Sequence, residues 1–252
     1  MGFDVDTTNN IVTVDHSHDI FSRTTVAGNP TTIRLSNGLK VTSIFSRTKG
    51  KRAKRGERPP GDNNPMLYAL KGMQNLKTTY RSVMDLYVNF QEILPVFINA
   101  GFQWDWLLPL PSSSQLTSIF ANKVAHQSGI GVCLNGTILK KSAQDVLDSL
   151  NNLQIKATER SALREDINRF IARNSPQTPF QIKAITRSQL RQHISPLKWG
   201  HIGIGSNPPR NVLLIDDMVT TGTSLMSAFD IIKHRYPTVR IEALTLFGST
   251  GR

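Results

Sequence analysis

The pattern of apolar and polar positions divides the chain into a strand-rich beginning and a longer part in which strands and helices alternate. Within the first 46 residues, TTIRLS and LKVTSIF flank Asn37-Gly38, a pair that favours a type I′ turn between β-branched strands. We therefore predict a β-hairpin there. From Trp104 onward, short apolar runs alternate with apolar residues at helical spacing, a pattern typical of a mostly parallel sheet flanked by helices.

Two helices are predicted between these regions. Asn64-Pro65 has the form of an N-cap followed by proline at the first helical position, and apolar residues follow at helical spacing. A second helix is expected from about Tyr80 to Leu94, with Pro95 disturbing its end. Its apolar face is expected to consist of Val83, Tyr87, Phe90 and Leu94.

The α/β part contains four apolar strand candidates. WDWLLPLP at 104–111 and GIGVCL at 129–134 flank a helix expected at 112–127 and closed by Gly129. Residues 135–210 are mostly polar and helical in tendency. Residues 211–215 and 239–247 are the last two expected strands, around a helix that stops near Pro237. The inward faces of the two helices are expected to be Leu116, Ile119, Phe120 and Val124, and Leu225, Phe229 and Ile232.

The composition adds a strong positive charge. Lysine and arginine outnumber the acidic residues by 30 to 18, and the net charge of +12 attracts nucleic acid, nucleotides or polyphosphates. A solvated basic surface without a dedicated partner explains the same charge. The sequence has neither an apolar stretch near the roughly 20 residues that span a bilayer nor the order of a signal peptide. The lone Cys133 fits a reducing compartment, and we expect a cytoplasmic protein without a membrane partner.

One segment concentrates the cationic residues. Residues 47–58, RTKGKRAKRGER, cannot bury apolar surface and therefore predict a linker or extended loop. We divide the chain into residues 1–64, a β-hairpin extension with a basic linker, and residues 65–252, an α/β core with an insertion around 135–210. Candidate nucleic-acid contacts in the linker are Lys49, Lys51, Arg52, Lys54 and Arg55.

The sequence NVLLIDDMVTTGTSL at 211–225 carries the clearest chemistry. An apolar strand ends in two carboxylates, Asp216 and Asp217, and ligands of open α/β sheets bind at such carboxyl ends. The small residues after them lead into a helix, whose first amides and nearby hydroxyls can hold one phosphate. Carboxylates for hydroxyl groups beside amides for a phosphate suit a sugar phosphate. The phosphate-binding candidates are Thr220, Thr221, Gly222, Thr223 and Ser224.

These residues resemble the signature of the type I phosphoribosyltransferases, in which an apolar strand, two acids and two mostly apolar residues precede Thr-Thr-Gly and two small residues. The resemblance implies that Asp216 and Asp217 meet the ribose hydroxyls of phosphoribosyl pyrophosphate (PRPP) and help to organise its Mg²⁺. It implies that residues 220–224 hold the 5′-phosphate, with no direct protein ligand to the metal. It also implies a type I phosphoribosyltransferase-like sheet, with the β-rich N-terminal extension as a hood.

A second match, LLPLPSSSQL at 107–116, resembles the pyrophosphate loop of the branch related to the competence protein ComF. It implies that pyrophosphate is bound by Ser112, Ser113 and Ser114. Capping of the following helix explains the same serines without a ligand. The chain departs from that branch in the long stretch between the two loops, about 100 residues, and in its first 60 residues.

A mobile basic loop closes over the pyrophosphate in this family, within the stretch between the two loops. By position, the resemblance implies this role for Lys140 and Lys141. Arg187 and Arg191 lie in the extra segment, where a lid or a partner surface is the functional alternative. Solvated surface charge is the favoured interpretation for these two arginines and for both lysines. Residues 64–73 also resemble the hood-to-core region of that branch, in which a lysine follows a helix, but Lys71 is hardly distinguishable from a surface lysine.

Two functions follow from the resemblance. The first is a phosphoribosyltransferase, a pentosyl glycosyltransferase of nucleotide metabolism that moves phosphoribosyl from PRPP to a nitrogen acceptor and releases pyrophosphate. The second is a PRPP-sensing or nucleic-acid-binding regulator, or a retron-type antiviral defence effector, on the same fold. The charge of the linker favours the second, whereas the retained acids serve both. A homo-oligomer or a protein partner stays open.

Other polar and aromatic groups are expected to be structural. Residues 15–19, DHSHD, resemble a metal cluster, but no further histidine or cysteine lies nearby in the sequence to complete a ligand shell. Cys133 is expected to be a small core residue. Trp104 and Trp106 are expected to pack in the core rather than to stack on bases.

Overall fold

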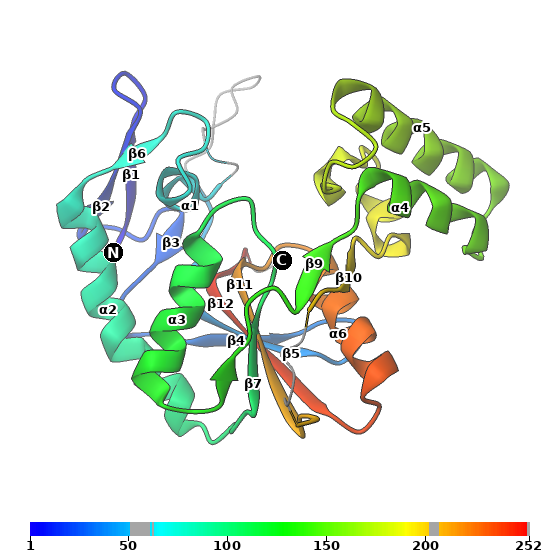
Figure 1. The fold of residues 1–252 in the computed structure, drawn as a ribbon. Coiled ribbons are helices and arrows are strands. Elements are labelled where there is room, and N and C mark those ends of the chain that lie inside the picture. Colours follow the sequence, from blue (N-terminus) through cyan, green and yellow to red (C-terminus); the bar gives the residue numbers. More distant parts are fainter. Residues whose placement is uncertain (51–60, 62, 202–206, 251–252) are drawn as a thin grey trace.

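The computed structural model describes residues 1–50, 61, 63–201 and 207–250 and has a mixed α/β architecture. Its largest sheet is mostly parallel, with strands in the order β3-β5-β12-β11-β7-β8 and β4 beside β5 (Figure 1). Strands β3 (Ser22–Arg23) and β4 (Thr31–Arg34) are antiparallel to β5. The parallel strands are β5 (Lys40–Arg47), β12 (Arg240–Thr250), β11 (Asn211–Met218), β7 (Trp106–Pro109) and β8 (Val132–Cys133). The α/β class with a mostly parallel sheet, predicted from the sequence, is confirmed.

Helices cover both faces of this sheet, and the alternation of side chains along β11 explains how. Leu213 and Ile215 belong to a core shared with α2 (Tyr80–Asn99) and α3 (Leu116–Ser128). Val212 and Leu214 point to the opposite core, which contains α6 (Thr223–Arg235). All four side chains are fully buried, as expected for a parallel strand covered on both faces.

The predicted hairpin is present and belongs to the central sheet. Strands β4 and β5 pair across the turn, where Gly38 adopts φ 84°. The other edge of β5 pairs in parallel with β12, and Val41 on β5 is fully buried. Residues 40–47, which the sequence placed in an N-terminal extension, therefore lie inside the main sheet.

The beginning of the chain forms a second, small sheet beside the first. Strands β1 (Gly2–Asp6), β2 (Ile11–Asp15) and β6 (Lys77–Thr78) make it up, next to the short helix α1 (Pro65–Leu70). Phe3 joins this sheet to the main core through an edge contact with Phe247, with ring centroids 6.2 Å apart.

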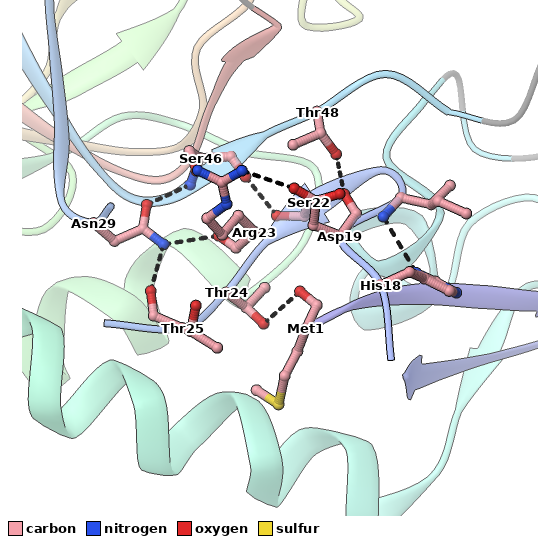
Figure 2. A network of polar contacts seen from close by, with 11 residues as sticks. Met1, His18, Asp19, Ser22, Arg23, Thr24, Thr25, Asn29, Ser46 and Thr48 are labelled. Carbon is pink, nitrogen blue, oxygen red and sulfur yellow. Dashed lines mark hydrogen bonds and ion pairs between the residues drawn. The ribbon is translucent and has the colours of Figure 1, made fainter. Parts of the chain in front are cut away.

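A network of hydrogen bonds connects residues 22–29, which follow the small sheet in sequence, to the end of β5 (Figure 2). Asn29 is at its centre: its amide nitrogen donates to the carbonyls of Arg23 and Thr25, and its Oδ1 accepts the Ser46 amide at 2.9 Å. Ser22 Oγ donates to the Ser46 carbonyl at 2.8 Å. The loop between β3 and β4 is therefore held to the end of β5 through hydrogen bonds on several sides.

The predicted insertion folds as a helical module, residues 141–196, between the antiparallel strands β9 (Ile138–Lys140) and β10 (Leu197–Trp199). It contains α4 (Ala143–Ser149), α5 (Ala157–Arg173) and 3₁₀ turns, among them Ile182–Ala184, and it extends away from the main sheet (Figure 1). It has a core of its own. The fully or almost fully buried members are Val146, Leu150, Leu163, Ile167, Phe180 and Ile185.

Several local predictions can be judged directly. Asn64 caps α1 through its side chain and Pro65 starts the helix, as predicted, and Gly129 ends α3 in the left-handed conformation at φ 64°. Pro95 does not end α2, which runs to Asn99. Proline removes one helical hydrogen bond, but buried Ile93, Leu94 and Phe97 hold the surrounding turns against the core.

The predicted inward faces of α2 and α3 are partly wrong. Ile119 of α3 is 52% exposed and Val83 of α2 is 36% exposed, because both line an open groove between the two helices. Within the described part of the chain, no helix is both long enough and apolar enough to cross a membrane.

Candidate functional site

A cleft of about 260 Å³ lies at the carboxyl ends of β7 and β11. Asp216 and Asp217 end β11, and the residues after β7 lie beside them. The turn after α1 contributes one side of the cleft, and the helical module contributes another. Its lining includes Leu67, Tyr68, Lys71, Met73, Leu110, Ser112, Ser113, Lys140, Phe180, Gln181, Ile182, Lys183, Asp216, Asp217 and Ser224.

Asp217 is buried and held by three side chains that converge on one oxygen. Its Oδ2 lies 2.5 Å from Lys71 Nζ, 3.1 Å from Thr117 Oγ1 and 3.3 Å from Ser112 Oγ. The carboxylate is 10% exposed and the Lys71 side chain 13%, so the pair is largely removed from water. A buried ion pair of this kind is costly to break, because either partner alone would be a desolvated charge.

Lys71 and Thr117 are the contacts that the sequence did not single out as partners of the acids. Lys71 is the C-cap of α1, and its sequence context hardly distinguishes it from a surface lysine. Thr117 follows the three serines at the start of α3, where a hydroxyl can face the end of the neighbouring strand. Its position directly behind the serine loop is the signal by which it could have been found.

Asp216 is in a different environment from its neighbour. It is half-buried, and its Oδ1 accepts the amide of Asp217 at 2.9 Å. Burial raises its pKa to about 8, with a further contribution from the charge of Asp217, against the opposing effects of that amide, Lys71 and Lys140. The protonated form of Asp216 is therefore favoured in the cleft at neutral pH.

Residues 220–224 form a smaller hollow of about 60 Å³ that also contacts Asp216 and Ile182. Gly222, at φ 73°, is the N-cap of α6, and within the described residues no side chain caps that helix. A β-carbon on Gly222 would lie 2.6 Å from the side chain of Leu35. The bare N-terminus of α6 thus directs backbone N–H groups at this hollow, which suits an anion.

The three serines after β7 have separate roles in the structure. Ser112 and Ser113 line the cleft, and Ser112 Oγ also accepts the Ser114 amide at 3.4 Å. Ser114 Oγ accepts the amide of Leu116 at 3.4 Å, at the start of α3. The first two serines therefore face the cleft, whereas Ser114 supports the helix N-terminus.

The two adjacent lysines of the predicted basic loop also have different surroundings. Lys140 lines the cleft, where burial lowers its pKa and the charge of Asp216 opposes that shift. Lys141 instead lies near Asp145 and Lys198, and burial lowers its pKa too.

The helical module supplies cations of its own. Lys183, which the sequence analysis passed over, brings a further charge to the lining of the cleft. Arg191 Nε donates to the Ile185 carbonyl inside the module, and Arg187 is exposed.

Lys49 and the metal candidates are not among the residues that line the cleft. Lys49 is exposed, and the other linker candidates, Lys51, Arg52, Lys54 and Arg55, lie outside the described residues. In the segment 15–19, His16 faces Asp85 and Asp19 pairs with Arg23, as Figure 2 shows for the second pair. Asp4, Asp15 and His18 place one ligand atom each within 4.8 Å of one another.

The remaining candidates for structural roles are packed side chains. Trp104 and Trp106 are 3% and 4% exposed and belong to the cores on opposite faces of the sheet. Cys133 is partly buried beside the first of these cores, and burial raises the pKa of its thiol.

The cleft thus brings together two carboxylates, a helix N-terminus, hydroxyl groups and lysines, a set that can bind a sugar bearing phosphates at both ends. A scan against protein-family models finds no match to this chain, and neither does a search of the curated proteins. The likeness of residues 211–225 to phosphoribosyltransferases therefore depends on the motif alone.

Proposed function

We propose that this protein binds PRPP with Mg²⁺ and transfers its phosphoribosyl group to a nitrogen acceptor with release of pyrophosphate. One observation supports the proposal most strongly. The acids at 216–217 and the serines after β7 are about 100 residues apart, yet they meet around one cleft at the carboxyl ends of β7 and β11, and the hollow of the loop 220–224 shares Asp216 with that cleft.

Each group has a role that fits its surroundings. The N-terminus of α6 and the hydroxyls of residues 220–224 would hold the 5′-phosphate. Asp216 would accept a hydrogen bond from a ribose hydroxyl, beside an Asp217 that Lys71 keeps in place. Ser112, Ser113 and Lys140 would bind the pyrophosphate.

The reaction is a displacement at C1 of the ribose. The nitrogen lone pair of the acceptor forms the new bond, the bond from C1 to the pyrophosphate oxygen breaks, and the acceptor loses its N–H proton to water. Carboxylate and phosphate oxygens are the ligands that Mg²⁺ prefers, and the ion would neutralise charge on the pyrophosphate. The protein's contribution is to orient PRPP and to stabilise the separating charges.

Calorimetric titration of PRPP with Mg²⁺ tests the binding step. At pH 9, where Asp216 is ionised, Asp216→Asn leaves the Lys71–Asp217 pair in place and should weaken binding by about 100-fold, the effect of removing a hydrogen bond to a charged group. Asp148→Asn, an exposed acid on α4, removes the same charge outside the cleft and should bind as the wild type does. Equal affinity of the Asp216→Asn variant, with unchanged circular dichroism, would contradict the proposed site.

Release of pyrophosphate in the presence of a panel of nucleobases and amines tests the transfer step. Release that depends on one acceptor and disappears in Asp216→Asn would support the transferase. Tight PRPP binding without release for any acceptor would instead favour the PRPP-sensing regulator, which uses the same residues without turnover.

A further inference from the structure

The small hollow at the start of α6 has one wall residue that comes from the helical module. Among the described residues, eight of the nine that line the hollow belong to the segment 216–225, and the ninth is Ile182. The same isoleucine also lines the main cleft. Its half-buried side chain therefore lies at the border between the hollow and the cleft.

The module holds Ile182 in position from both directions along the chain. Phe180 before it and Ile185 after it are fully or almost fully buried in the module core. The 3₁₀ turn Ile182–Ala184 lies between them, and the Ile185 amide donates to the Ile182 carbonyl at 3.1 Å. The Phe180 amide donates to the Lys141 carbonyl at 2.9 Å, directly after β9. Ile182 is thus held in the wall of the hollow before any ligand binds, which lowers the entropic cost of binding.

The hollow has polar groups from its own loop and hydrocarbon from the module. The N-terminus of α6 has no side-chain cap among the described residues, and the hydroxyl oxygens of Thr221 and Thr223 lie 2.9 Å apart. Ile182 adds an apolar surface that can neither donate nor accept a hydrogen bond. The hollow of about 60 Å³ is far smaller than the roughly 300 Å³ at which pockets for whole small molecules begin. It therefore suits one phosphate group with nothing larger attached to it.

We propose that Ile182 makes this hollow selective for a terminal phosphate monoester and excludes ligands in which the same phosphate carries a further group. Such a group would need the space that the Ile182 side chain occupies, and isoleucine offers no hydrogen bond in place of the water that the group loses. The inference rests on the proposed function, because it takes the loop 220–224 as the phosphate site. It adds a specificity-determining residue that comes from the module rather than from that loop.

Calorimetric titration of the full chain with ribose 5-phosphate and with ADP-ribose tests the proposal, because ADP-ribose carries the same ribose 5-phosphate joined to AMP. The wild type should bind ADP-ribose at least about 100-fold more weakly. Ile182→Ala should reduce this ratio to about 10-fold or less, since it removes the side chain beyond the β-carbon. Ile155→Ala is the matched control and should keep the wild-type ratio. Ile155 is also half-buried against the module core, but it lines neither the hollow nor the cleft.

The result for ribose 5-phosphate separates this inference from the proposed function. Failure of the wild type to bind it would overturn both, because the loop would then not be a phosphate site. Equal affinity of the wild type for the two ligands, or an unchanged ratio in Ile182→Ala, would overturn the role of Ile182 alone. Circular dichroism verifies that the variants are folded. If Ile182→Ala does not fold, Ile182→Val, which removes one methylene group, should lower the ratio by a smaller factor, and an unchanged ratio would again overturn the proposal.

Discussion

Two neighbouring aspartates in this protein have become chemically different residues. Asp217 is fixed by the ammonium group of Lys71 and by two hydroxyls, so its negative charge has partners before any ligand arrives. Asp216 accepts a backbone amide, and burial beside a second acid raises its pKa to about 8. Asp217 therefore holds the surrounding side chains in position, whereas Asp216 is available to exchange a proton or to bind a ligand.

We expect Asp216→Asn to stabilise the ligand-free protein at high pH. Because the pKa of Asp216 is raised on folding, the folded state binds more protons than the unfolded state between about pH 4 and pH 8, and stability falls as pH rises through that window. Asparagine removes this dependence. The stability advantage of the variant over the wild type should grow by a few kcal/mol between pH 5 and pH 9, because each pH unit below the folded pKa is worth about 1.4 kcal/mol.

Ligand binding should depend on pH in the opposite direction from stability. If ionised Asp216 binds the ligand, PRPP affinity of the wild type should increase from pH 6 to pH 9. Differential scanning calorimetry measures the first effect and calorimetric titration the second. A stability difference that is equal at pH 5 and pH 9 would contradict the raised pKa.

At the scale of single elements, the start of α6 depends on Gly222. The left-handed φ of 73° allows the chain to turn from β11 into the helix, and a β-carbon would lie 2.6 Å from the side chain of Leu35, which would have to shift. The helix begins without a side-chain cap among the described residues, so its first N–H groups face the hollow. The geometry of one residue thus sets the orientation of the proposed phosphate site.

We expect Gly222→Ala to cost more stability than Gly129→Ala. Both glycines have positive φ at a helix end, but a β-carbon on Gly129 would meet nothing within 4 Å. The control should lose about 1 kcal/mol, the cost of a left-handed alanine, and Gly222→Ala a further 1–3 kcal/mol from the collision with Leu35. Urea denaturation measures both, and equal losses would show that Leu35 yields without cost.

The elements that the sequence predicted well are those with strong local signals. The apolar run before Asp216 became β11, and the Asn37-Gly38 pair produced the turn between β4 and β5. The parallel partner of β5 is β12, about 200 residues away, and no local pattern specifies such a pairing. The ion pair between Lys71 and Asp217 escaped prediction for the same reason: a lysine after a short helix has the same sequence context whether it is exposed or buried.

At the scale of the molecule, the cleft that contains Asp216 lies between two hydrophobic cores. The sheet and its covering helices provide the acids and the phosphate loop, whereas the helical module has its own core and contributes Phe180 to Lys183 to the lining. The two-stranded ribbon of β9 and β10 joins the module to the remainder. Such units commonly unfold separately, because few buried contacts cross between them.

We expect Phe180→Ala to destabilise the module alone. Phe180 is 1% exposed, and its loss should cost about 3–5 kcal/mol within the module core. Hydrogen exchange should then accelerate for amides of α4 and α5 and stay unchanged for β11 and β12. Ile232→Ala, in the core of α6, is the control that should affect the sheet. An equal loss of protection in β11 and α5 of the Phe180→Ala variant would show that the chain unfolds as one unit.

The separate core of the helical module has a consequence for how this protein can change over evolutionary time. Substitutions among Phe180 to Lys183 alter the shape and charge of one side of the cleft, while Gly222 and the two aspartates are supported by a different set of buried residues. The side of the cleft formed by the module can therefore change, or be replaced together with the module, under selection that leaves the loop from 216 to 224 unaltered. Descendants of one ancestral chain could diverge in what they bind on that side and still share the same loop.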